Sequence, residues 1–328
     1  MRTPRIKIAP ESGEAAYHCT TRTVNGERLF DNTAKEVLRK QIWLVAEFCG
    51  VQIVTYAILS NHFHVLVRVP QKIAIADSEL LRRYRLLHPK PTCYQTARLK
   101  AIEAQLTDDG PDAVAWRNRM SALMGDLSQY MKLLKQRFSI WFNKSHQRYG
   151  TLWSERFRSV LVEGVGRVLQ TMAAYIDLNC VRAGLVEDPK DYRFCGYAEA
   201  TSGNEAARDG IGLVCGERKW IETQSAYRKL LFGTGVGPRE KGGGISIEAF
   251  KRVMAEGGKL PLADALRCRI RYFTNGAVLG SKAFVETQLA AYRTKTGRRE
   301  RTGPRALPSI ADWGELTVLR KVRQPALG

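Results

Sequence analysis

The segment Asn61-His62-Phe63-His64 places two imidazoles two residues apart. Because successive side chains of a β-strand alternate between its faces, His62 and His64 point the same way on a strand, and Phe63 points into the opposite layer. Two imidazoles side by side on a rigid strand form a ready pair of metal ligands. The alternative is two independent histidines on a solvated sheet face, because an H-x-H pair alone is a weak motif.

A tyrosine and an asparagine stand four residues apart in Ala174-Tyr175-Ile176-Asp177-Leu178-Asn179. On a helix this spacing puts Tyr175 and Asn179 on one face, about 6 Å apart along the axis. If that face lies against the H-x-H strand, the Asn179 carbonyl oxygen can be a third metal ligand and the Tyr175 hydroxyl lies beside the metal. The alternative for Tyr175 is an amphipathic position at the edge of a core. Asp177 is expected to point away from both.

The hydrophobic pattern predicts the elements that would position these residues. Alternating β-rich runs indicate strands, apolar residues at helical spacing indicate helices, and Gly, Asn and Asp mark the ends. Together they predict a small α+β domain with a four-stranded antiparallel sheet and flanking helices. The predicted elements are a strand from Tyr17, a helix capped by Asp31 or Asn32 and closed at Gly50, strands at 51–59 and 62–69, a helix at about 123–143, a strand at 156–162 and a helix at about 165–181.

Three further segments are predicted around this domain, which would span residues 1–200. Residues 71–125 form a helical insertion, and the Gly-rich residues 201–245 a linker. Residues 246–328 form a C-terminal helical region in which 262–273 and 281–293 make a candidate DNA-binding helix-turn-helix. A helical pair that packs on the main domain is the alternative.

Composition narrows the class of protein. The chain has 328 residues, 44% of them hydrophobic, and 52 Lys and Arg against 32 Asp and Glu, a net charge of +20. This balance favours a polyanionic partner, with nucleic acid first. No stretch approaches the ~18 apolar residues of a membrane span, and the N-terminus lacks the apolar core of a secretory signal. The seven cysteines contain no C-x-x-C pair, which is typical of reduced thiols in a cytoplasmic protein.

Four segments carry a resemblance to a known family. The segments are Tyr-Ala-Ile-Leu-Ser-Asn-His-Phe-His-Val-Leu-Val at 56–67, Gly-Thr-Leu-Trp-Ser-Glu-Arg-Phe at 150–157, Tyr-Ile-Asp-Leu-Asn-Cys-Val-Arg-Ala-Gly-Leu-Val at 175–186 and Asp191-Tyr192. They occur in the same order as in that family. From about Tyr17 to Tyr197 the chain resembles the REP-associated tyrosine transposases of the single-tyrosine HUH superfamily. Cys180 stands where that family usually has Pro; we expect a local backbone change there without loss of activity.

The resemblance implies both fold and mechanism. It implies an HUH domain, ferredoxin-like or RRM-like, in which His62, His64 and Asn179 are the metal ligands and Tyr175 is the nucleophile. It further implies a 5′-phosphotyrosine intermediate, which lets one site cleave and rejoin DNA without ATP. The family implies Mg²⁺ or Mn²⁺, whereas imidazole ligands alone suit zinc or manganese, so manganese satisfies both arguments.

Partner and DNA contacts follow the same resemblance. The expected partner is single-stranded DNA with a hairpin, often a repetitive extragenic palindrome, bound by a nucleoid-associated monomer or homodimer with no membrane contact. Basic side chains would contact phosphates, and Trp153 would stack on a base. The alternative is a solvated basic face with Trp153 in the core. The candidate DNA-binding residues are Lys132, Arg137, Arg148, Trp153, Arg156 and Arg158.

Two other functions remain open at this point. One is a non-catalytic DNA-binding protein of the same fold. The other is a metal-dependent phosphodiesterase that uses water as its nucleophile and forms no covalent adduct with DNA.

Overall fold

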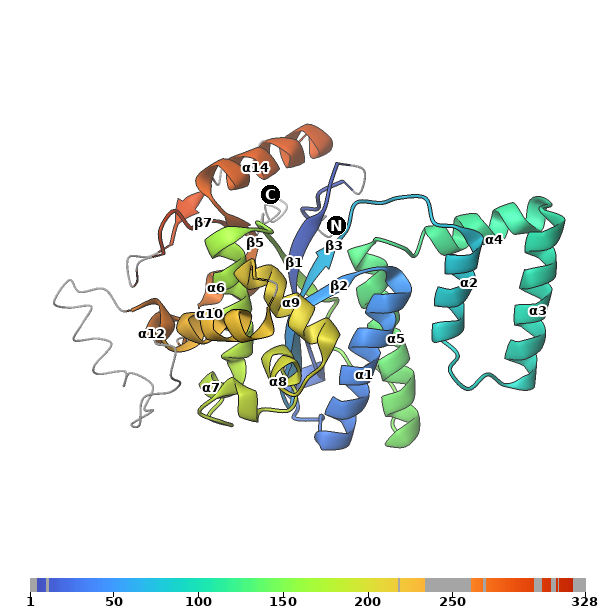
Figure 1. The fold of residues 1–328 in the computed structure, drawn as a ribbon, viewed down its shortest axis with the longest axis horizontal. Coiled ribbons are helices and arrows are strands. Elements are labelled where there is room, and N and C mark those ends of the chain that lie inside the picture. Colours follow the sequence, from blue (N-terminus) through green and yellow to red (C-terminus); the bar gives the residue numbers. More distant parts are fainter. Residues whose placement is uncertain are drawn as a thin grey trace, which may run out of the picture.

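The central feature of the fold is one mixed sheet. A computed structural model describes residues 5–9, 12–217, 219–233, 261–267, 270–297, 303–307, 311 and 313–320. Within these residues, seven strands form a sheet in the order β2-β3-β1-β4-β5-β7-β6, with helices on both faces (Figure 1). The predicted α+β class is therefore confirmed, but the sheet has more strands than the four expected.

The first half of the sheet follows the sequence pattern closely. β1 (Ala15–Arg22) leads through a short 3-10 turn, η1 (Val24–Gly26), to α1 (Asn32–Cys49), and β2 (Gln52–Ile58) and β3 (His62–Val69) form a hairpin. The Asp31 carboxylate caps α1 by accepting a hydrogen bond from the Ala34 amide at 2.7 Å. Gly50 ends the helix at φ 64°, a left-handed conformation that glycine adopts freely.

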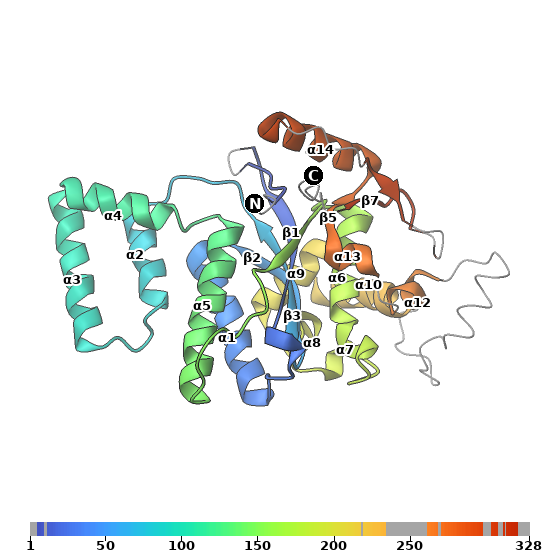
Figure 2. The same ribbon diagram turned by 180° about the vertical axis from the view of Figure 1, so that it is seen from behind.

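Two helical layers enclose this part of the sheet. α5 (Leu127–Ser145) packs beside α1 on one face, whereas α6 (Gly166–Asp177) crosses β2 and β3 on the other (Figures 1 and 2). β4 (Arg158–Val162) pairs with β1, and α7 (Asn179–Arg182) follows α6 after one residue. β1 lies between β3 and β4 and pairs antiparallel with both.

Residues 71–125 are helical and project from the sheet. They contain α2 (Asp77–Leu86), α3 (Cys93–Asp108) and α4 (Pro111–Ser121), which stand beside α1 and α5 at one end of the molecule (Figure 1). Arg117 ties α4 to α2 through an ion pair with Asp77 at 2.7 Å. The helices occupy the segment for which an insertion is predicted.

The prediction of a linker over 201–245 is wrong for its first part. After a 3-10 turn, η2 (Pro189–Asp191), come α8 (Gly196–Thr201), α9 (Glu205–Cys215) and α10 (Trp220–Phe232). α9 lies so close to β2 that a Cβ on Gly210 would be 2.5 Å from the Val54 carbonyl oxygen. The glycines of this stretch thus allow close packing. Residues 234–260, which hold the glycine clusters, lie outside the described part of the chain.

The C-terminal region is not a helix-turn-helix. The first predicted helix is replaced by two short ones, α12 (Leu262–Leu266) and α13 (Arg271–Asn275), and β5 (Gly276–Gly280) separates them from α14 (Lys282–Thr296). β5 pairs in parallel with β4 through Leu161↔Val278 and Val162↔Leu279. An unpaired β4 would expose a row of backbone hydrogen-bonding groups, and β5 satisfies them. β6 (Arg305–Ala306) and β7 (Thr317–Arg320) then complete the sheet.

Two predictions about chemical environment can be compared with the described residues. The six cysteines among them are free thiols; Cys268 lies outside this part. None of the described helices is both long and apolar enough to traverse a bilayer.

Candidate functional site

The H-x-H segment lies on β3 as the alternation rule predicts. In the antiparallel pair with β1, His64 is opposite Thr20 and His62 is opposite Arg22. Phe63 points to the other face, where its ring contacts Trp153 at 5.9 Å between centroids. The two imidazoles are neighbours, with centroids 5.1 Å apart.

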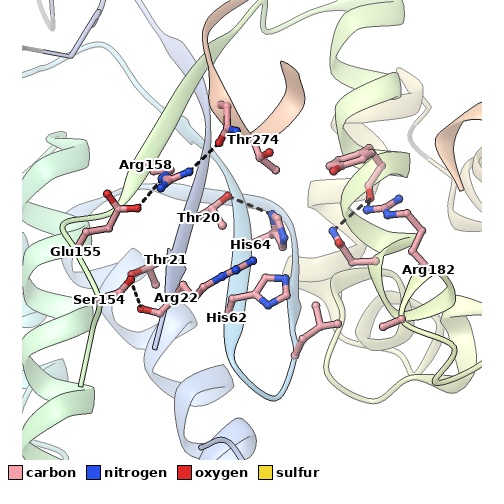
Figure 3. A pocket seen from close by; sticks show the side chains of 15 residues that line it. Thr20, Thr21, Arg22, His62, His64, Ser154, Glu155, Arg158, Arg182 and Thr274 are labelled. Carbon is pink, nitrogen blue, oxygen red and sulfur yellow. Dashed lines mark hydrogen bonds and ion pairs between the residues drawn. The ribbon is translucent and has the colours of Figure 1, made fainter. Parts of the chain in front are cut away.

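His64 is held in a buried polar contact. Its Nδ1 lies 2.8 Å from Nε2 of His18 on β1 and 3.2 Å from the Thr20 hydroxyl (Figure 3). Burial lowers the pKa of His18 to about 4 and holds the pKa of His64 well below its usual value; the positive charge of Arg182 adds to both effects. The imidazoles of His18 and His64 are therefore neutral at pH 7, and the neutral form is the one that ligates metals.

Tyr175 and Asn179 lie on consecutive helices, not on one. α6 ends at Asp177, and Leu178 separates it from α7, with ψ near 1°. The Asn179 side chain donates through Nδ2 to the carbonyl oxygens of Ile176 at 3.2 Å and Tyr175 at 3.4 Å. Such side-chain bonds compete with the helical backbone pattern, which accounts for the break. The predicted unbroken helix is wrong here, yet Tyr175 and Asn179 still line one cavity.

Arg182 fixes the tyrosine from the C-terminal side. Its guanidinium carbon lies 3.9 Å from the centre of the Tyr175 ring, and its Nη2 donates to the Tyr175 carbonyl at 2.7 Å. Nη1 donates to the carbonyl of Leu266 on α12 at 2.6 Å. The Tyr175 ring also meets Phe273 of α13 edge to face, with centroids 4.9 Å apart. C-terminal residues thus help to hold the tyrosine.

One cavity of about 380 Å³ brings these groups together. Three guanidinium groups and one carboxylate line it, so its charged side chains are mainly positive; the carboxylate, Glu155, is paired with Arg158 at 2.6 Å. Figure 3 shows Arg22 reaching from the end of β1 toward His62 and His64. The lining residues are Thr20, Thr21, Arg22, Leu59, His62, His64, Ser154, Glu155, Arg158, Tyr175, Asn179, Arg182, Ala183, Thr274 and Asn275.

Asp177 has a separate, buried environment, in line with the sequence expectation. Its carboxyl accepts hydrogen bonds from the hydroxyls of Thr55 at 2.8 Å and Tyr227 at 2.5 Å, and from the Tyr197 amide at 3.2 Å. Burial raises the pKa of Asp177 to about 7, although these three donors oppose the shift. The carboxyl therefore anchors α6 to β2 and α10.

The predicted DNA-binding residues do not gather in one place. Of the six, only Arg158 lines the cavity; Lys132 and Arg156 are exposed outside it. Arg148 forms an ion pair with Glu27 at 3.6 Å, and the Arg137 guanidinium donates to the Leu87 carbonyl at 3.1 Å.

The stacking role of Trp153 is wrong. Only 8% of the residue is exposed, and its ring packs against Phe30, Phe63 and Phe138. Its indole Nε1 donates to the Ser139 hydroxyl at 2.7 Å. A ring enclosed by other aromatic side chains offers no free face to a base, so Trp153 belongs to the core between the sheet and α5.

The sequence analysis missed several residues that line the cavity and one, His18, that lies behind it. Arg22 and Arg182 carry the positive charge, His18 and Thr20 contact His64, and Asn275 accepts a hydrogen bond from Arg158 at 2.8 Å. His18 and Arg22 point to the same face of the sheet as His62 and His64. The sequence indicates this only once the pairing of β1 with β3 is known. Nothing local in the sequence marks Asn275.

The donor set fits a divalent cation. Two imidazoles and an amide oxygen are ligands that Mn²⁺ accepts. The Nδ2 bonds of Asn179 to the helix backbone turn its Oδ1 the other way, and within the described residues that oxygen accepts no hydrogen bond. No cluster of three or more His, Cys, Asp or Glu suited to a metal occurs in the described part of the chain. A site here therefore needs the amide of Asn179.

Comparison with known proteins agrees with the resemblance seen in the sequence. Residues 12–82 match a family described as "Transposase IS200 like", which confirms the likeness over β1 to α2 and supports DNA transposase as the broad class of function. None of the curated proteins matches the chain. Among solved structures, the chain is similar to a REP-associated tyrosine transposase bound to a REP hairpin. That match has 14% sequence identity, covers 62% of this chain and 87% of the other, and has a TM-score of 0.36.

Proposed function

We propose that this protein is a metal-dependent transposase that cleaves and rejoins single-stranded DNA through a covalent bond to Tyr175. The observation that carries the proposal is the single cavity that a phenol, two imidazoles, an amide and three guanidinium groups line together. The match of residues 12–82 to IS200-like transposases supports the same class.

The proposed reaction is a transesterification. The phenolic oxygen of Tyr175 forms a bond to the scissile phosphorus while the bond from phosphorus to the 3′ oxygen breaks. The phenol loses its proton and the departing 3′ oxygen gains one, which leaves a 5′-phosphotyrosine and a 3′-hydroxyl. Because the phosphodiester is conserved in the phosphotyrosine, the reverse attack by a 3′-hydroxyl rejoins strands with no added energy source.

The side chains around Tyr175 have distinct roles in this proposal. Arg182 orients the tyrosine through its contact with the ring and its hydrogen bond to the Tyr175 carbonyl. Arg22 forms no ion pair with the described residues, so its guanidinium can bind a DNA phosphate. A divalent cation bound by His62, His64 and Asn179 would neutralise charge that develops on the phosphate. Arg158 and Arg156 would contact flanking phosphates.

The proposed partner is hairpin-forming single-stranded DNA. The net charge of +20 supports a polyanion, and the motif resemblance supports a hairpin of the palindromic type. Lys132 is exposed on α5, away from the cavity, and would serve only as a distant phosphate contact.

The test is covalent capture of labelled DNA. The purified full chain is incubated with hairpin DNA from the flanks of its own gene, with Mg²⁺ or Mn²⁺, and resolved on a denaturing gel. We expect an adduct that EDTA, Tyr175→Phe and His64→Ala each abolish. Tyr94→Phe is the matched control, because Tyr94 is 84% exposed on α3, outside the cavity.

Each other outcome supports a different function. Metal-dependent cleavage without an adduct would indicate attack by water and a phosphodiesterase. Hairpin binding without cleavage by either metal would indicate a DNA-binding protein that does no chemistry. An adduct that persists in Tyr175→Phe would place the nucleophile elsewhere.

A further inference from the structure

A third imidazole lies behind the two of the H-x-H segment. His18 comes from β1, is 1% exposed, and lies edge to edge with His64, with ring centroids 5.0 Å apart and ring planes 16° apart. It is not among the residues that line the cavity. Both of its ring nitrogens face other groups, Nδ1 the carbonyl oxygen of Phe273 and Nε2 the ring of His64, so neither points to a cation in the cavity. Its position calls for a different role.

Both ring nitrogens of His18 have hydrogen-bond partners. Nδ1 of His18 lies 2.7 Å from the carbonyl oxygen of Phe273, and a carbonyl can only accept a hydrogen bond. His18 therefore carries its proton on Nδ1. In a neutral imidazole the other nitrogen then has a lone pair, so Nε2 of His18 is an acceptor.

This acceptor determines the tautomer of His64. Nε2 of His18 is 2.8 Å from Nδ1 of His64, and two lone pairs at that distance would repel each other. Nδ1 of His64 therefore carries the proton and donates it to His18. The lone pair of His64 is then on Nε2, the nitrogen on the far side of the ring from His18.

Thr20 alone would not make this choice. Its hydroxyl is 3.2 Å from Nδ1 of His64, but a hydroxyl can accept from a protonated nitrogen or donate to an unprotonated one. Both tautomers of His64 satisfy Thr20 equally. Only His18, whose own tautomer is fixed by a backbone carbonyl, distinguishes between them.

We infer that Phe273, His18 and His64 form a hydrogen-bonded relay that fixes the tautomer of His64 and presents its Nε2 to the cavity as a ligand for a divalent cation. The inference rests on the proposed metal-dependent function and assigns His18 as a positioning residue. A metal-binding histidine usually donates its other nitrogen to an acceptor that holds the ring in place, and here that acceptor is another imidazole.

The relay makes the C-terminal region part of the metal site. Phe273 lies in α13, 255 residues from His18, and α13 packs on β1. The same residue contacts the ring of Tyr175. One short helix thus contributes a backbone acceptor to the proposed ligand side and a side chain to the proposed nucleophile side, so segments far apart in the sequence combine in one site.

The first experiment reads the tautomer directly in the full chain without metal or DNA. Long-range ¹H–¹⁵N correlation spectra of ¹⁵N-histidine-labelled protein distinguish Nδ1–H from Nε2–H imidazoles. We expect His64 in the Nδ1–H form, and a mixture or the Nε2–H form in His18→Leu. An Nε2–H form of His64 in the unsubstituted protein would overturn the relay, whatever the variants do.

The second experiment measures Mn²⁺ binding by electron paramagnetic resonance, again without DNA. Loss of an outer hydrogen-bond partner typically costs 10–100-fold in metal affinity, and we expect about that loss in His18→Leu. His18→Gln supplies an amide oxygen that can accept from Nδ1 of His64 and should recover most of the affinity. His88→Leu is the matched control, because His88 packs on Tyr84 of α2 and does not line the cavity, and it should leave the Mn²⁺ affinity unchanged.

The outcomes separate the relay from the proposed function. If His64→Ala binds Mn²⁺ as tightly as the unsubstituted protein, the proposed metal site fails, and the consequence of the relay for metal binding fails with it. If His64→Ala loses Mn²⁺ but His18→Leu does not, the metal site stands and the relay is refuted. Should His18→Leu not fold, as judged by circular dichroism, an affinity loss in folded His18→Gln as large as that of His64→Ala would also refute it.

Discussion

Removal of the Tyr227 hydroxyl tests whether Asp177 anchors α6, the helix that carries Tyr175. Tyr227 and Asp177 are both fully buried, and the hydroxyl donates to the carboxyl at 2.5 Å. In Tyr227→Phe the ring remains, so no cavity forms. One oxygen of the Asp177 carboxyl, however, loses its closest hydrogen-bond donor. Hydrogen bonds to charged groups contribute about 1.5–3 kcal/mol, and we expect the free energy of unfolding to fall by about 2 kcal/mol.

The measurement is urea and thermal unfolding followed by circular dichroism at pH 7.5. At ~2.1 cal/mol/K of unfolding entropy per residue, a chain of 328 residues shifts by ~1.5 °C per kcal/mol, so the midpoint should fall by roughly 3 °C with an unchanged urea slope. Tyr292→Phe is the matched control, because the Tyr292 hydroxyl is buried without a hydrogen-bond partner among the described residues. That variant should change stability by less than about 0.5 kcal/mol.

A double-mutant cycle identifies the carboxyl as the shared partner. Thr55 also donates to Asp177, from β2, so Thr55→Val and Tyr227→Phe should interact by ~0.5–3 kcal/mol when combined. Strict additivity, or a loss in Tyr227→Phe no greater than that in Tyr292→Phe, would refute the anchoring role. The rate of adduct formation with hairpin DNA should fall in parallel, because Asp177 lies two residues beyond Tyr175.

Three further predictions concern other parts of the molecule. Burial lowers the pKa of Lys135 to about 8, so its protonated form destabilises the fold below pH 8, and this penalty disappears as the pH rises toward the pKa of lysine in the unfolded chain. Relative to Lys135→Met, the unsubstituted protein should therefore gain ~1–2 kcal/mol of stability between pH 7 and 10, after allowance for partial exposure. A stability difference between the two proteins that does not change with pH would contradict this. Gly210→Ala should lower stability by ~1–3 kcal/mol, because the new Cβ would meet the Val54 carbonyl at 2.5 Å; a neutral result in chemical unfolding would show that α9 can move off β2. Arg22→Ala should weaken hairpin binding and reduce the salt slope by ~0.7–0.9, the share of one phosphate contact, and an unchanged slope in titrations at several salt concentrations would exclude Arg22 from the DNA interface.

Local pattern was sufficient for the elements that form from neighbouring residues. Asp31 and Gly50 mark the ends of α1 because capping and left-handed backbone depend on single residues. The alternation of β3 puts His62 and His64 on one face and Phe63 on the other, because the strand period is two. The spacing of Tyr175 and Asn179 likewise brings both to one cavity, even though the helix breaks between them.

The tertiary structure alone decided which distant residues complete the site. His18, Arg22 and Asn275 reach the cavity region only through strand pairing and through the docking of α13 on β1, and neither leaves a local signal. The sequence alone did not decide between base stacking and a core position for Trp153, because a tryptophan beside arginines has the same local pattern in a core as in a DNA interface. The prediction of a helix-turn-helix is wrong for a related reason. The Gly-flanked segment between the two helices forms β5, because it pairs with the edge of β4, and no local sequence pattern reveals that edge.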